Sequence, residues 1–479
     1  MRAVTGLRDT NNTDIVESLS TFDLPKIREF QKRTKLGKLD HIPGGSGLPF
    51  IGHTYWFLTD SHAWIDRKYA KNGPVFRAKT PILDMVMLLG PEANKLVFKN
   101  EGKIFSNFLA WDNTFENLFD NALMERDFAG HKKERKVLQQ AFKRPAIESH
   151  IQIMSPALKA GIEQWPTGRT IKAMDHVKQL LLNVGAKVFL GLEMGPQADT
   201  INQAFVDIVA GCGDPIRRKE IWFSPYAKGI RASKTLCKYI MDTIPERRKV
   251  AGDDMFSQLC HMRDDEGKLI KAEKIRDHII FVLFAAHDTT TSSLSAILYA
   301  LASNLEWQEE LREEMSSLNK EGIEFDDINA LQKTGWTFKE ALRMYPALSV
   351  IPRYALKDFE FNGHLIPANT IVTVSSVFTH YMPEYWTNPY KFDPYRFSPE
   401  RAEEKQHSFQ YIPFGGGAHK CLGLHFADVQ VKIFLFHLLK NYKVTKNRKM
   451  KKYKYNNIPL TFPTDGLPLR FDKIAPTRK

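Results

Sequence analysis

The chain has 479 residues, of which 43% are hydrophobic, so it is long enough to bury a large core. Lys and Arg number 68 against 55 for Asp and Glu, which gives a net charge of +13. This charge suits an anionic partner such as nucleic acid, an acidic protein or a lipid surface, and equally an ordinary solvated surface. The four cysteines are too scattered for a disulfide framework or a CxxC site, which favours a reducing compartment: Cys212, Cys237, Cys260 and Cys421.

The N-terminal 40 residues contain no apolar run that resembles a signal peptide or a membrane span. The longest apolar run in the chain, 279–286, has eight residues and is too short to cross a bilayer. We therefore expect a cytoplasmic protein without a transmembrane anchor. A peripheral contact with a membrane stays open.

Hydrophobic periodicity divides the chain into a polar lead-in, residues 1–42, and one domain, residues 43–475. The predicted helices cover 60–71, 129–143, 172–190, 197–211, 226–249, 272–303, 333–345 and 422–440. The predicted strands cover 74–80, 84–89, 353–361, 370–376, 459–463 and 468–472. No internal repeat or linker divides residues 43–475. The pattern predicts a mainly α fold with a minor β portion in a single domain.

Residues 414–423, with the sequence Phe-Gly-Gly-Gly-Ala-His-Lys-Cys-Leu-Gly, form the most informative segment. Three successive glycines permit a tight loop with positive φ angles, whose N–H groups can point at the sulfur of Cys421. The predicted helix that follows places its positive end beside the same sulfur. These features favour a stabilised thiolate, although a Gly-rich turn beside a buried, inert cysteine has the same local pattern.

This segment resembles the cysteine-ligand loop of the cytochromes P450, the family of haem-thiolate monooxygenases. The family's positions are filled by Phe414, Gly415, Gly417, His419, Cys421 and Gly423, with His419 in place of the more usual Arg. The resemblance implies the family's fold, with a long central helix over haem b (iron protoporphyrin IX). It also implies that Cys421 is the ligand of the haem iron.

Glu340 and Arg343 lie three residues apart on the predicted helix 333–345, so their side chains share a face. Such a pair is common on solvated helices and alone indicates nothing more. In the family it forms a buried network with an Arg from a later Pro-rich segment, which here is Arg396. The resemblance implies that the three hold the core together. Tyr395 departs from the family's pattern, so no role follows for it.

Residues 285–290, Ala-Ala-His-Asp-Thr-Thr, lie midway along the longest predicted helix. Thr and Ser at 289–293 disfavour a regular helix because their side chains compete for backbone groups. The segment can be an ordinary helix face that carries hydroxyl groups. By resemblance it is the oxygen-binding site, where Thr289 and Asp288 act as the catalytic pair that delivers protons. Ala286 stands where the family commonly has Gly, which narrows the expected groove.

His131 and Arg135 lie four residues apart and share a helix face. The resemblance implies that this face, Arg353 and His419 bind the haem propionates, because charge-assisted hydrogen bonds suit carboxylates. Phe414 and Gly423 complete the implied haem-binding residues. Taken alone, each of these basic residues can also be an ordinary charged residue on the surface.

The resemblance implies insertion of one oxygen atom of O₂ into a C–H bond of a hydrophobic substrate: a sterol, a terpenoid or retinoid, or a fatty acid. It implies a substrate pocket whose residues would otherwise be ordinary core: Phe281, Phe284, Ala285, Val350, Ile351 and Leu460.

The chain has no GxGxxG fingerprint and no cysteine cluster for an iron–sulfur centre, so electrons must come from another protein. An acidic ferredoxin with an NAD(P)H-driven ferredoxin reductase suits the basic residues that the resemblance places on the thiolate side: Lys132, Lys133, Lys136, Lys143, Arg144 and Lys420. The basic run 446–454 is either a solvated loop or a contact with anionic lipid.

Two other classes of function stay open. One is a thiolate-haem isomerase or peroxygenase that uses a hydroperoxide and needs no reductase, against which Asp288 and Thr289 argue. The other is a non-catalytic haem sensor. Nucleic-acid binding would explain the charge but none of the motifs, and we do not expect it.

Overall fold

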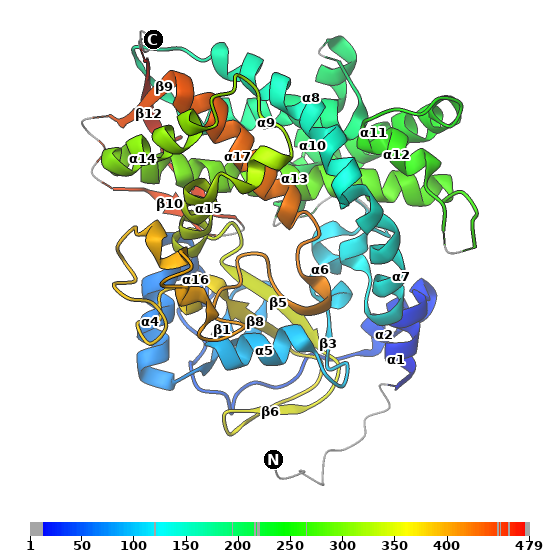
Figure 1. Cartoon of the computed structure of the whole chain (residues 1–479). Helices are drawn as coiled ribbons and strands as arrows, with labels where there is room; N and C mark the ends of the chain where they lie inside the picture. The colour runs from blue at the N-terminus through cyan, green and yellow to red at the C-terminus, as the bar shows by residue number, and fades with distance from the viewer. Residues whose placement is uncertain are drawn as a thin grey trace.

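The computed structural model describes residues 13–118, 121–193, 195–214, 217, 221–264, 266–447, 450, 452–457 and 460–474. Helices dominate the upper part of the molecule in Figure 1, and the largest β-sheet lies below them beside α4, α5 and α16. The helices are α1 (Thr13–Thr21), α2 (Leu24–Arg33), α3 (Thr54–Thr59), α4 (Ser61–Asn72), α5 (Pro91–Lys99), α6 (Phe108–Phe115), α7 (Phe128–Leu138), α8 (Arg144–Glu163), α9 (Ala173–Leu190), α10 (Pro196–Cys212), α11 (Pro225–Arg247), α12 (Met255–His261), α13 (Ala272–Ser303), α14 (Leu305–Ser317), α15 (Gln332–Met344), α16 (Ser376–His380) and α17 (Leu424–Asn441).

The strands form four small sheets. The largest has the order β1-β2-β8-β5-β3, in which β2 and β8 are parallel and the other neighbours antiparallel. A three-stranded sheet has the order β4-β12-β9, and β6-β7 and β10-β11 are two-stranded. The strands are β1 (Val75–Lys79), β2 (Asp84–Leu88), β3 (Phe105–Ser106), β4 (Thr170–Lys172), β5 (Val350–Ala355), β6 (Phe359–Phe361), β7 (His364–Ile366), β8 (Ile371–Ser375), β9 (Tyr442–Lys446), β10 (Tyr455–Asn456), β11 (Phe462–Pro463) and β12 (Pro468–Lys473).

The main hydrophobic core lies among the helices, where α13 and α17 contribute many buried side chains. Two smaller core clusters cover the faces of the five-stranded sheet. The structure therefore has the mainly α architecture with a minor β portion that the sequence predicts, and α13 has the predicted bounds of 272 and 303. A 32-residue helix through the centre of the core gives the molecule a rigid axis on which a site can be built.

Several predicted elements differ from the observed ones. The predicted strand 353–361 is wrong as one element, because β5 ends at Ala355 and β6 begins at Phe359. β5 pairs with β8 and β3, whereas β6 forms a separate hairpin with β7. The predicted helix 129–143 ends as α7 at Leu138 and continues as a short 3₁₀ turn to Phe142.

The described part of the lead-in, residues 13–42, forms two helices, α1 and α2, which lie beside α7 in Figure 1. Ile15, Leu19 and Ile27 are buried in the second core cluster. The sequence predicts only a polar lead-in here and gives no sign that these residues pack against the domain.

Among the described residues, one helical stretch is long and apolar enough to cross a membrane, Gly417–Asn441. Inside the protein, 67% of its most apolar window is buried, and α17 packs against α8, α14 and α15. Burial on this scale is typical of a core helix of a globular protein.

Candidate functional site

The loop that precedes α17 leaves the side chain of Cys421 accessible, within a site that the surrounding chain largely encloses. The backbone N–H of Cys421 donates to the carbonyl oxygen of Phe414 at 2.9 Å, which closes the loop. Gly417 has a φ of 62°, and an added Cβ there would lie 1.8 Å from the carbonyl oxygen of Phe98 on α5. Only glycine permits both the positive φ and this close approach of two backbones. The Gly-rich sequence therefore fixes the cysteine against α5.

The charge state of Cys421 depends on opposing effects. Burial among its surroundings raises the pKa of the thiol, while the backbone N–H of Gly423 and the cations Arg135 and Lys420 oppose that rise. The N–H donor and the two cations favour the thiolate, and a bound metal ion would displace the remaining proton. The loop thus supplies a single sulfur ligand with a donor from Gly423, the first residue before α17.

A cluster of three basic side chains lies beside this loop: His131, Arg353 and His419. We call it the cation cluster after Arg353, its one member that is charged at neutral pH. The rings of His131 and His419 are 3.9 Å apart between centroids. Burial and the neighbouring Arg135 and Arg353 lower the pKa of His131 to about 4, and burial, His131 and the same arginines hold the pKa of His419 well below its usual value. Burial lowers the pKa of Arg353 to about 10, against the opposing effect of Asp127.

The cation cluster has one carboxylate neighbour among the described residues, Asp127, which lies 3.7 Å from His419. Asp127 is already hydrogen-bonded to Ser106 and to the backbone N–H groups of Asn107 and Phe108. The guanidinium of Arg353 donates to the carbonyl oxygen of Pro352 at 2.8 Å. One buried guanidinium and two neutral imidazoles thus converge near a single committed carboxylate, and their N–H donors suit further carboxylates.

The middle of α13 has one face that is less buried than the rest of the helix. Phe281, Phe284, Ala285 and Thr289 all keep partial exposure, while most of their neighbours are buried. Their spacing of three, four and eight residues from Phe281 places them on one side of the helix. This face is therefore the accessible side of the helix, and three predicted pocket residues lie on it.

Thr289 and Asp288 point to different surroundings. The Thr289 hydroxyl donates to the carbonyl oxygen of Ala285 at 2.8 Å, one turn back along α13. Asp288 is 6% exposed and lies 3.1 Å from His287 and 3.3 Å from the Nζ of Lys178 on α9. Burial raises the pKa of Asp288, but His287 and Lys178 outweigh it, so the pKa is lowered. Asp288 thus connects the Thr289 turn to the half-exposed Lys178.

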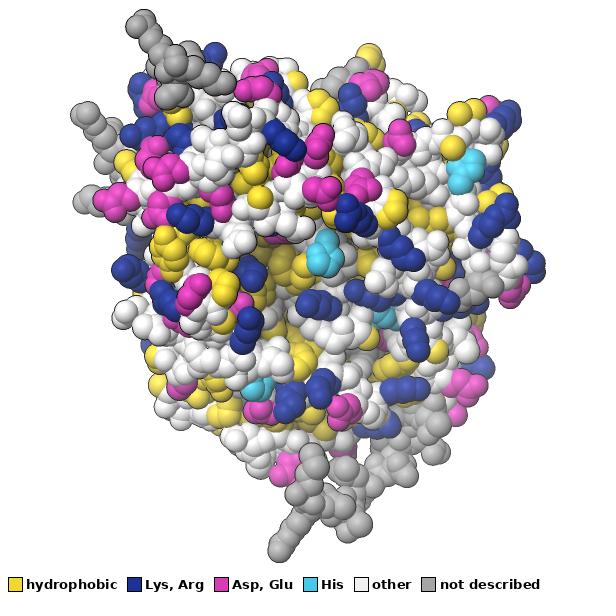
Figure 2. Space-filling model, in the orientation of Figure 1, with side chains coloured by type: hydrophobic (Ala, Val, Ile, Leu, Met, Phe, Trp, Pro, Cys, Tyr) yellow, Lys and Arg dark blue, Asp and Glu magenta, His cyan; other side chains and the backbone are white. Residues whose placement is uncertain are grey.

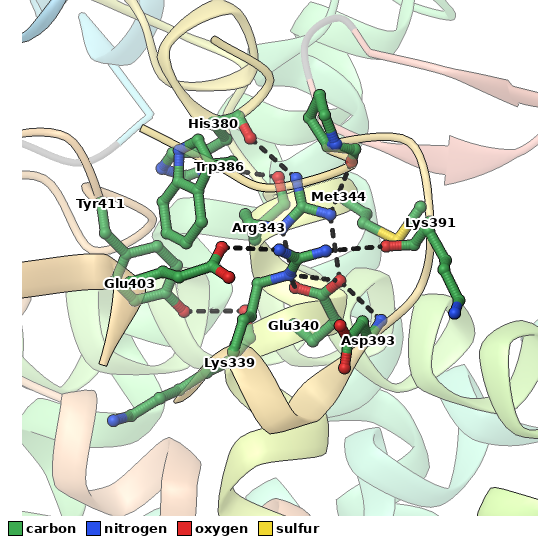
Figure 3. Close-up of polar contacts among 12 residues, drawn as sticks. Lys339, Glu340, Arg343, Met344, His380, Trp386, Lys391, Asp393, Glu403 and Tyr411 are labelled. Atoms are coloured by element: carbon green, nitrogen blue, oxygen red, sulfur yellow. Dashed lines mark hydrogen bonds and ion pairs between the residues drawn. The ribbon is translucent and has the colours of Figure 1, made fainter. Parts of the chain in front are cut away.

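Glu340, Arg343 and Arg396 meet in a fully buried network (Figure 3). The carboxylate of Glu340 lies 2.7 Å from Nε of Arg343 and 3.2 Å from Nε of Arg396. The backbone N–H of Asp393 also donates to Glu340 at 2.9 Å, and Glu403 lies 2.7 Å from Arg396. The two arginines are thus matched by two carboxylates, a condition that buried charges require.

The remaining predicted pocket residues do not all lie together. Val350 and Ile351 are neighbours on β5, so their side chains point to opposite faces of the sheet. Val350 packs with the second core cluster and Ile351 belongs to the third. That both line one pocket stays a prediction; Ile351 shares its face with Arg353. Leu460 is half-buried and precedes Thr461, whose carbonyl accepts from Ser292 of α13.

Sequence reasoning missed four residues of the site: Asp127, Lys178, Glu403 and Trp111. Asp127 lies four residues before His131, and Glu403 lies seven residues after Arg396. Neither residue belongs to the motif that it neighbours. Lys178 lies 110 positions before its partner Asp288, so no local pattern joins them. Trp111 stacks on Phe115, whose ring meets Phe284 on α13 at 5.4 Å between centroids. The aromatic composition of this segment was the available signal.

Comparison with known proteins places this chain in a family. Residues 42–469 match the family model described as Cytochrome P450, so the chain belongs to the cytochrome P450 family. A Mycobacterium tuberculosis protein named as cytochrome P450 136 is 29% identical over 436 residues, which cover 90% of this chain and 88% of that protein. The taxane 10-beta-hydroxylase of Taxus cuspidata is 28% identical, with 84% of this chain and 83% of that protein covered.

Among solved structures, the retinoic acid bound cyanobacterial CYP120A1 has a TM-score of 0.80 and is 26% identical, covering 90% of this chain and 99% of that chain. The chain is therefore a haem-dependent cytochrome P450 monooxygenase with the fold of that family.

The residues present fit a haem. The sulfur of Cys421, in the loop before α17, suits the iron. The cation cluster, which has a single carboxylate neighbour among the described residues, suits the two propionates. The partly exposed face of α13 supplies an apolar wall with one hydroxyl. Basic side chains gather on one part of the face shown in Figure 2, where Figure 1, in the same orientation, places α7.

Proposed function

We propose that this chain binds haem b through Cys421 and inserts one oxygen atom of O₂ into a C–H bond of a hydrophobic substrate. The observation that carries the proposal is the position of Cys421, presented by a glycine-fixed loop beside the buried cation cluster. When bound, the thiolate-ligated haem supplies the oxygen-activating chemistry. The residues of the chain bind and orient the haem, shape the substrate space and control protons.

In this proposal Cys421 ligates the iron and Gly423 donates its N–H to the sulfur. His131, Arg135, Arg353 and His419 bind the propionates. Phe414 packs at the base of the loop, with its ring 6.0 Å from that of Phe338. Glu340, Arg343 and Arg396 hold α15 and the segment before the loop in register.

Asp288 and Thr289 control protons on the other side of the site. Asp288 exchanges protons with solvent through Lys178, which is 38% exposed on its side chain. Thr289 holds its hydroxyl on the carbonyl of Ala285 and can turn it toward the accessible side of α13. An acid connected to the surface beside a hydroxyl in the pocket is the arrangement that delivery of protons requires. This pair favours a monooxygenase over an isomerase or peroxygenase, which would need no delivered protons, and over a non-catalytic sensor.

We propose a terpenoid or retinoid substrate, with sterols and fatty acids as the alternatives. The names of similar proteins refer to taxane, beta-amyrin and abscisic acid, and the similar solved structure is a retinoic acid complex. The wall formed by Phe281, Phe284 and Phe115 is broad and apolar, which suits a bulky lipid.

We propose an acidic ferredoxin, reduced by an NAD(P)H-driven reductase, as the electron donor. Lys132, Lys133 and Lys420 are exposed on α7 and on the cysteine loop, next to Cys421 in the fold. Charge of this kind steers an acidic partner to the thiolate side. Arg144 is less suitable than we expected, because it already pairs with Glu148 and Asp326.

We propose a cytoplasmic protein, since the apolar stretch 417–441, which contains α17, is mostly buried. We also propose a peripheral contact of the basic run 446–454 with anionic lipid as the alternative to a solvated loop; residues 448, 449 and 451 of that run lie outside the described residues.

The test is a ligand screen on purified haem-loaded protein. Terpenoids, retinoids, sterols and fatty acids are titrated, the shift of the Soret band is recorded, and the products made with a surrogate ferredoxin and its reductase are identified by mass spectrometry. Hydroxylated products that require both O₂ and reduced ferredoxin support the proposal. Turnover of a lipid hydroperoxide without any reductant, and no oxygenation of these lipids, would favour the isomerase.

A further inference from the structure

Two helices that precede the family-matched region fold onto the body of the protein. We call α1 and α2, residues 13–33, the N-terminal hairpin; the family match begins at residue 42. Ile15, Leu19 and Ile27 are buried in the same core cluster as Phe108 of α6. The hairpin thus lies outside the family-matched region and packs against α6.

The hairpin also reaches α7. An added Cβ at Gly130 would lie 2.8 Å from the carbonyl oxygen of Ser20, at the end of α1. The guanidinium of Arg126, just before α7, lies 3.5 Å from the ring centroid of Phe22 in the hairpin. Contacts this close leave no layer of water between the hairpin and the two helices.

An ion pair joins the hairpin to the middle of α6. Arg28 and Gln31, both on α2, donate to the same carboxylate oxygen of Asp112; the distance from Gln31 is 2.9 Å. Asp112 is 2% exposed, whereas the side chain of Arg28 is 34% exposed. A carboxylate buried to this degree depends on its partners, because burial without them is unfavourable.

Helix α6 contacts two different parts of the molecule from one broad side. Phe108 and Asp112, four residues apart, contact the hairpin, and the ring of Phe108 meets Phe22 at 5.7 Å between centroids. Trp111 and Phe115 lie on the adjacent stripe of the same side, and Phe115 meets Phe284 of α13. Helix α6 therefore bridges the hairpin and the face of α13 that carries Thr289.

We propose that the N-terminal hairpin clamps α6 over the substrate space and so limits the entry of bulky ligands, with Asp112 as a positioning residue. A helix of eight residues is not stable on its own, so its contacts decide its position. Loss of Arg28 leaves the carboxylate of Asp112 buried without its ion pair, which is unfavourable. Movement of α6 toward water lowers this cost, because it exposes the carboxylate to solvent. That movement carries Trp111 and Phe115 away from α13. The proposal rests on the proposed function, because it assumes that ligands reach the haem through the substrate space beside α13.

The experiment measures how fast two nitrogen ligands of haem iron, imidazole and the bulkier phenylimidazole, bind the ferric haem-loaded enzyme. Stopped-flow absorbance gives both association rates for the wild type and for Arg28→Met. We expect Arg28→Met to raise the phenylimidazole rate about tenfold, within the range of couplings between sites, and to leave the imidazole rate nearly unchanged. A structural defect would instead change both rates or the haem spectrum.

Three further variants make the result specific. Arg33→Met is the matched control, because Arg33 lies on the same helix but pairs with Glu29 and is 77% exposed on its side chain. Arg28→Lys keeps the charge and should restore most of the selectivity. Arg28→Met should add nothing to Asp112→Asn, if both act through one pair.

Equal phenylimidazole rates in the wild type, Arg28→Met and Arg33→Met, with a normal thiolate spectrum of the reduced carbon monoxide complex, would overturn the clamp. Absence of that spectrum in the wild type would instead contradict the proposed haem site, so the two failures are distinguishable.

Discussion

At the scale of single residues, burial separates Arg396 from the arginines around it. Arg396 has no exposed side-chain surface and lies between Glu340 and Glu403, whereas Arg401, which also pairs with Glu403, is 36% exposed. We expect Arg396→Met to lower the free energy of unfolding by about 3–5 kcal/mol, because it leaves buried carboxylates unpaired. Chemical denaturation measures the change.

Arg401→Met is the control for this prediction, since exposed ion pairs contribute about 1 kcal/mol or less. Similar losses from the two variants would contradict the view that Arg396 is special because it is buried.

His380 is a second buried residue whose charge state matters. Its Nδ1 lies 3.1 Å from the carbonyl oxygen of Arg343, and the N–H of Ile412 donates to its Nε2 at 2.9 Å, so the ring is neutral. Burial and the nearby Arg343 lower the pKa of His380 to about 3. The unfolded chain, with an ordinary His pKa, therefore binds the proton first as the pH falls below about 6.5.

Stability should accordingly fall with pH, and His380 alone should contribute about 4 kcal/mol of loss between pH 6.5 and 3. Denaturation curves across this range test it. His380→Asn keeps a donor toward Arg343 without titrating and should make the pH dependence less steep, while His131 and other buried histidines still contribute. His41→Gln, at an exposed histidine, should leave it unchanged; a pH dependence as steep in His380→Asn as in the wild type would count against the assignment.

The residues that the sequence could predict are those that belong to short motifs. Cys421, Glu340 and Arg343 stand in such motifs, and the structure brings Glu340 and Arg343 together with Arg396. Asp127 and Lys178 could not be predicted, because their partners are chosen by packing between helices far apart in the sequence. The assignment of Val350 and Ile351 to one pocket stays a prediction, and the strand sends their two side chains to opposite faces.

At the scale of elements, α13 combines a buried body with one partly exposed face. Thr289 bonds back to Ala285 from that face, and Thr291 makes the same bond to His287 from a fully buried position. We expect Thr289→Val to lower the yield of oxygenated product per NAD(P)H by at least about tenfold, because a positioned proton donor contributes about a hundredfold or more. Hydrogen peroxide should rise in compensation.

Thr291→Val is the matched control, because it removes the same hydroxyl from the same helix away from the open face. Product yield and peroxide are measured together for both variants. An unchanged yield in Thr289→Val, or an equal loss in Thr291→Val, would contradict the role of the exposed face.

Element boundaries were predictable where periodicity is long. α13 has its predicted bounds, and β1 and β2 lie within the predicted strands. Short elements were less predictable, because tertiary pairing decides where they end; β5 and β6 belong to different sheets although their sequences run together. The burial of α1 and α2 depends on the surface of α6 and α7, which no local pattern encodes.

At the scale of the whole molecule, part of the net charge of +13 can be assigned to one side of the protein. Lys132 and Lys133 are exposed on α7, on the side that carries Cys421. We expect Lys132→Glu with Lys133→Glu to raise the KM for an acidic ferredoxin about tenfold at low salt and to weaken the salt dependence of electron transfer, because charge steers the encounter. Steady-state reduction at several ionic strengths measures both.

Lys234→Glu, at an exposed residue of α11, is the control and should leave the KM unchanged. Electron transfer that is insensitive to ionic strength in the wild type would contradict the ferredoxin proposal without affecting the haem site.

The central claim is that Cys421 binds the haem iron, and the spectrum of the reduced carbon monoxide complex tests it most directly. The wild type should show the absorbance band of a thiolate-ligated haem, and Cys421→Ser should lose it. Cys260→Ser, at a buried cysteine in α12, should keep it. A thiolate band that persists in Cys421→Ser would contradict the account.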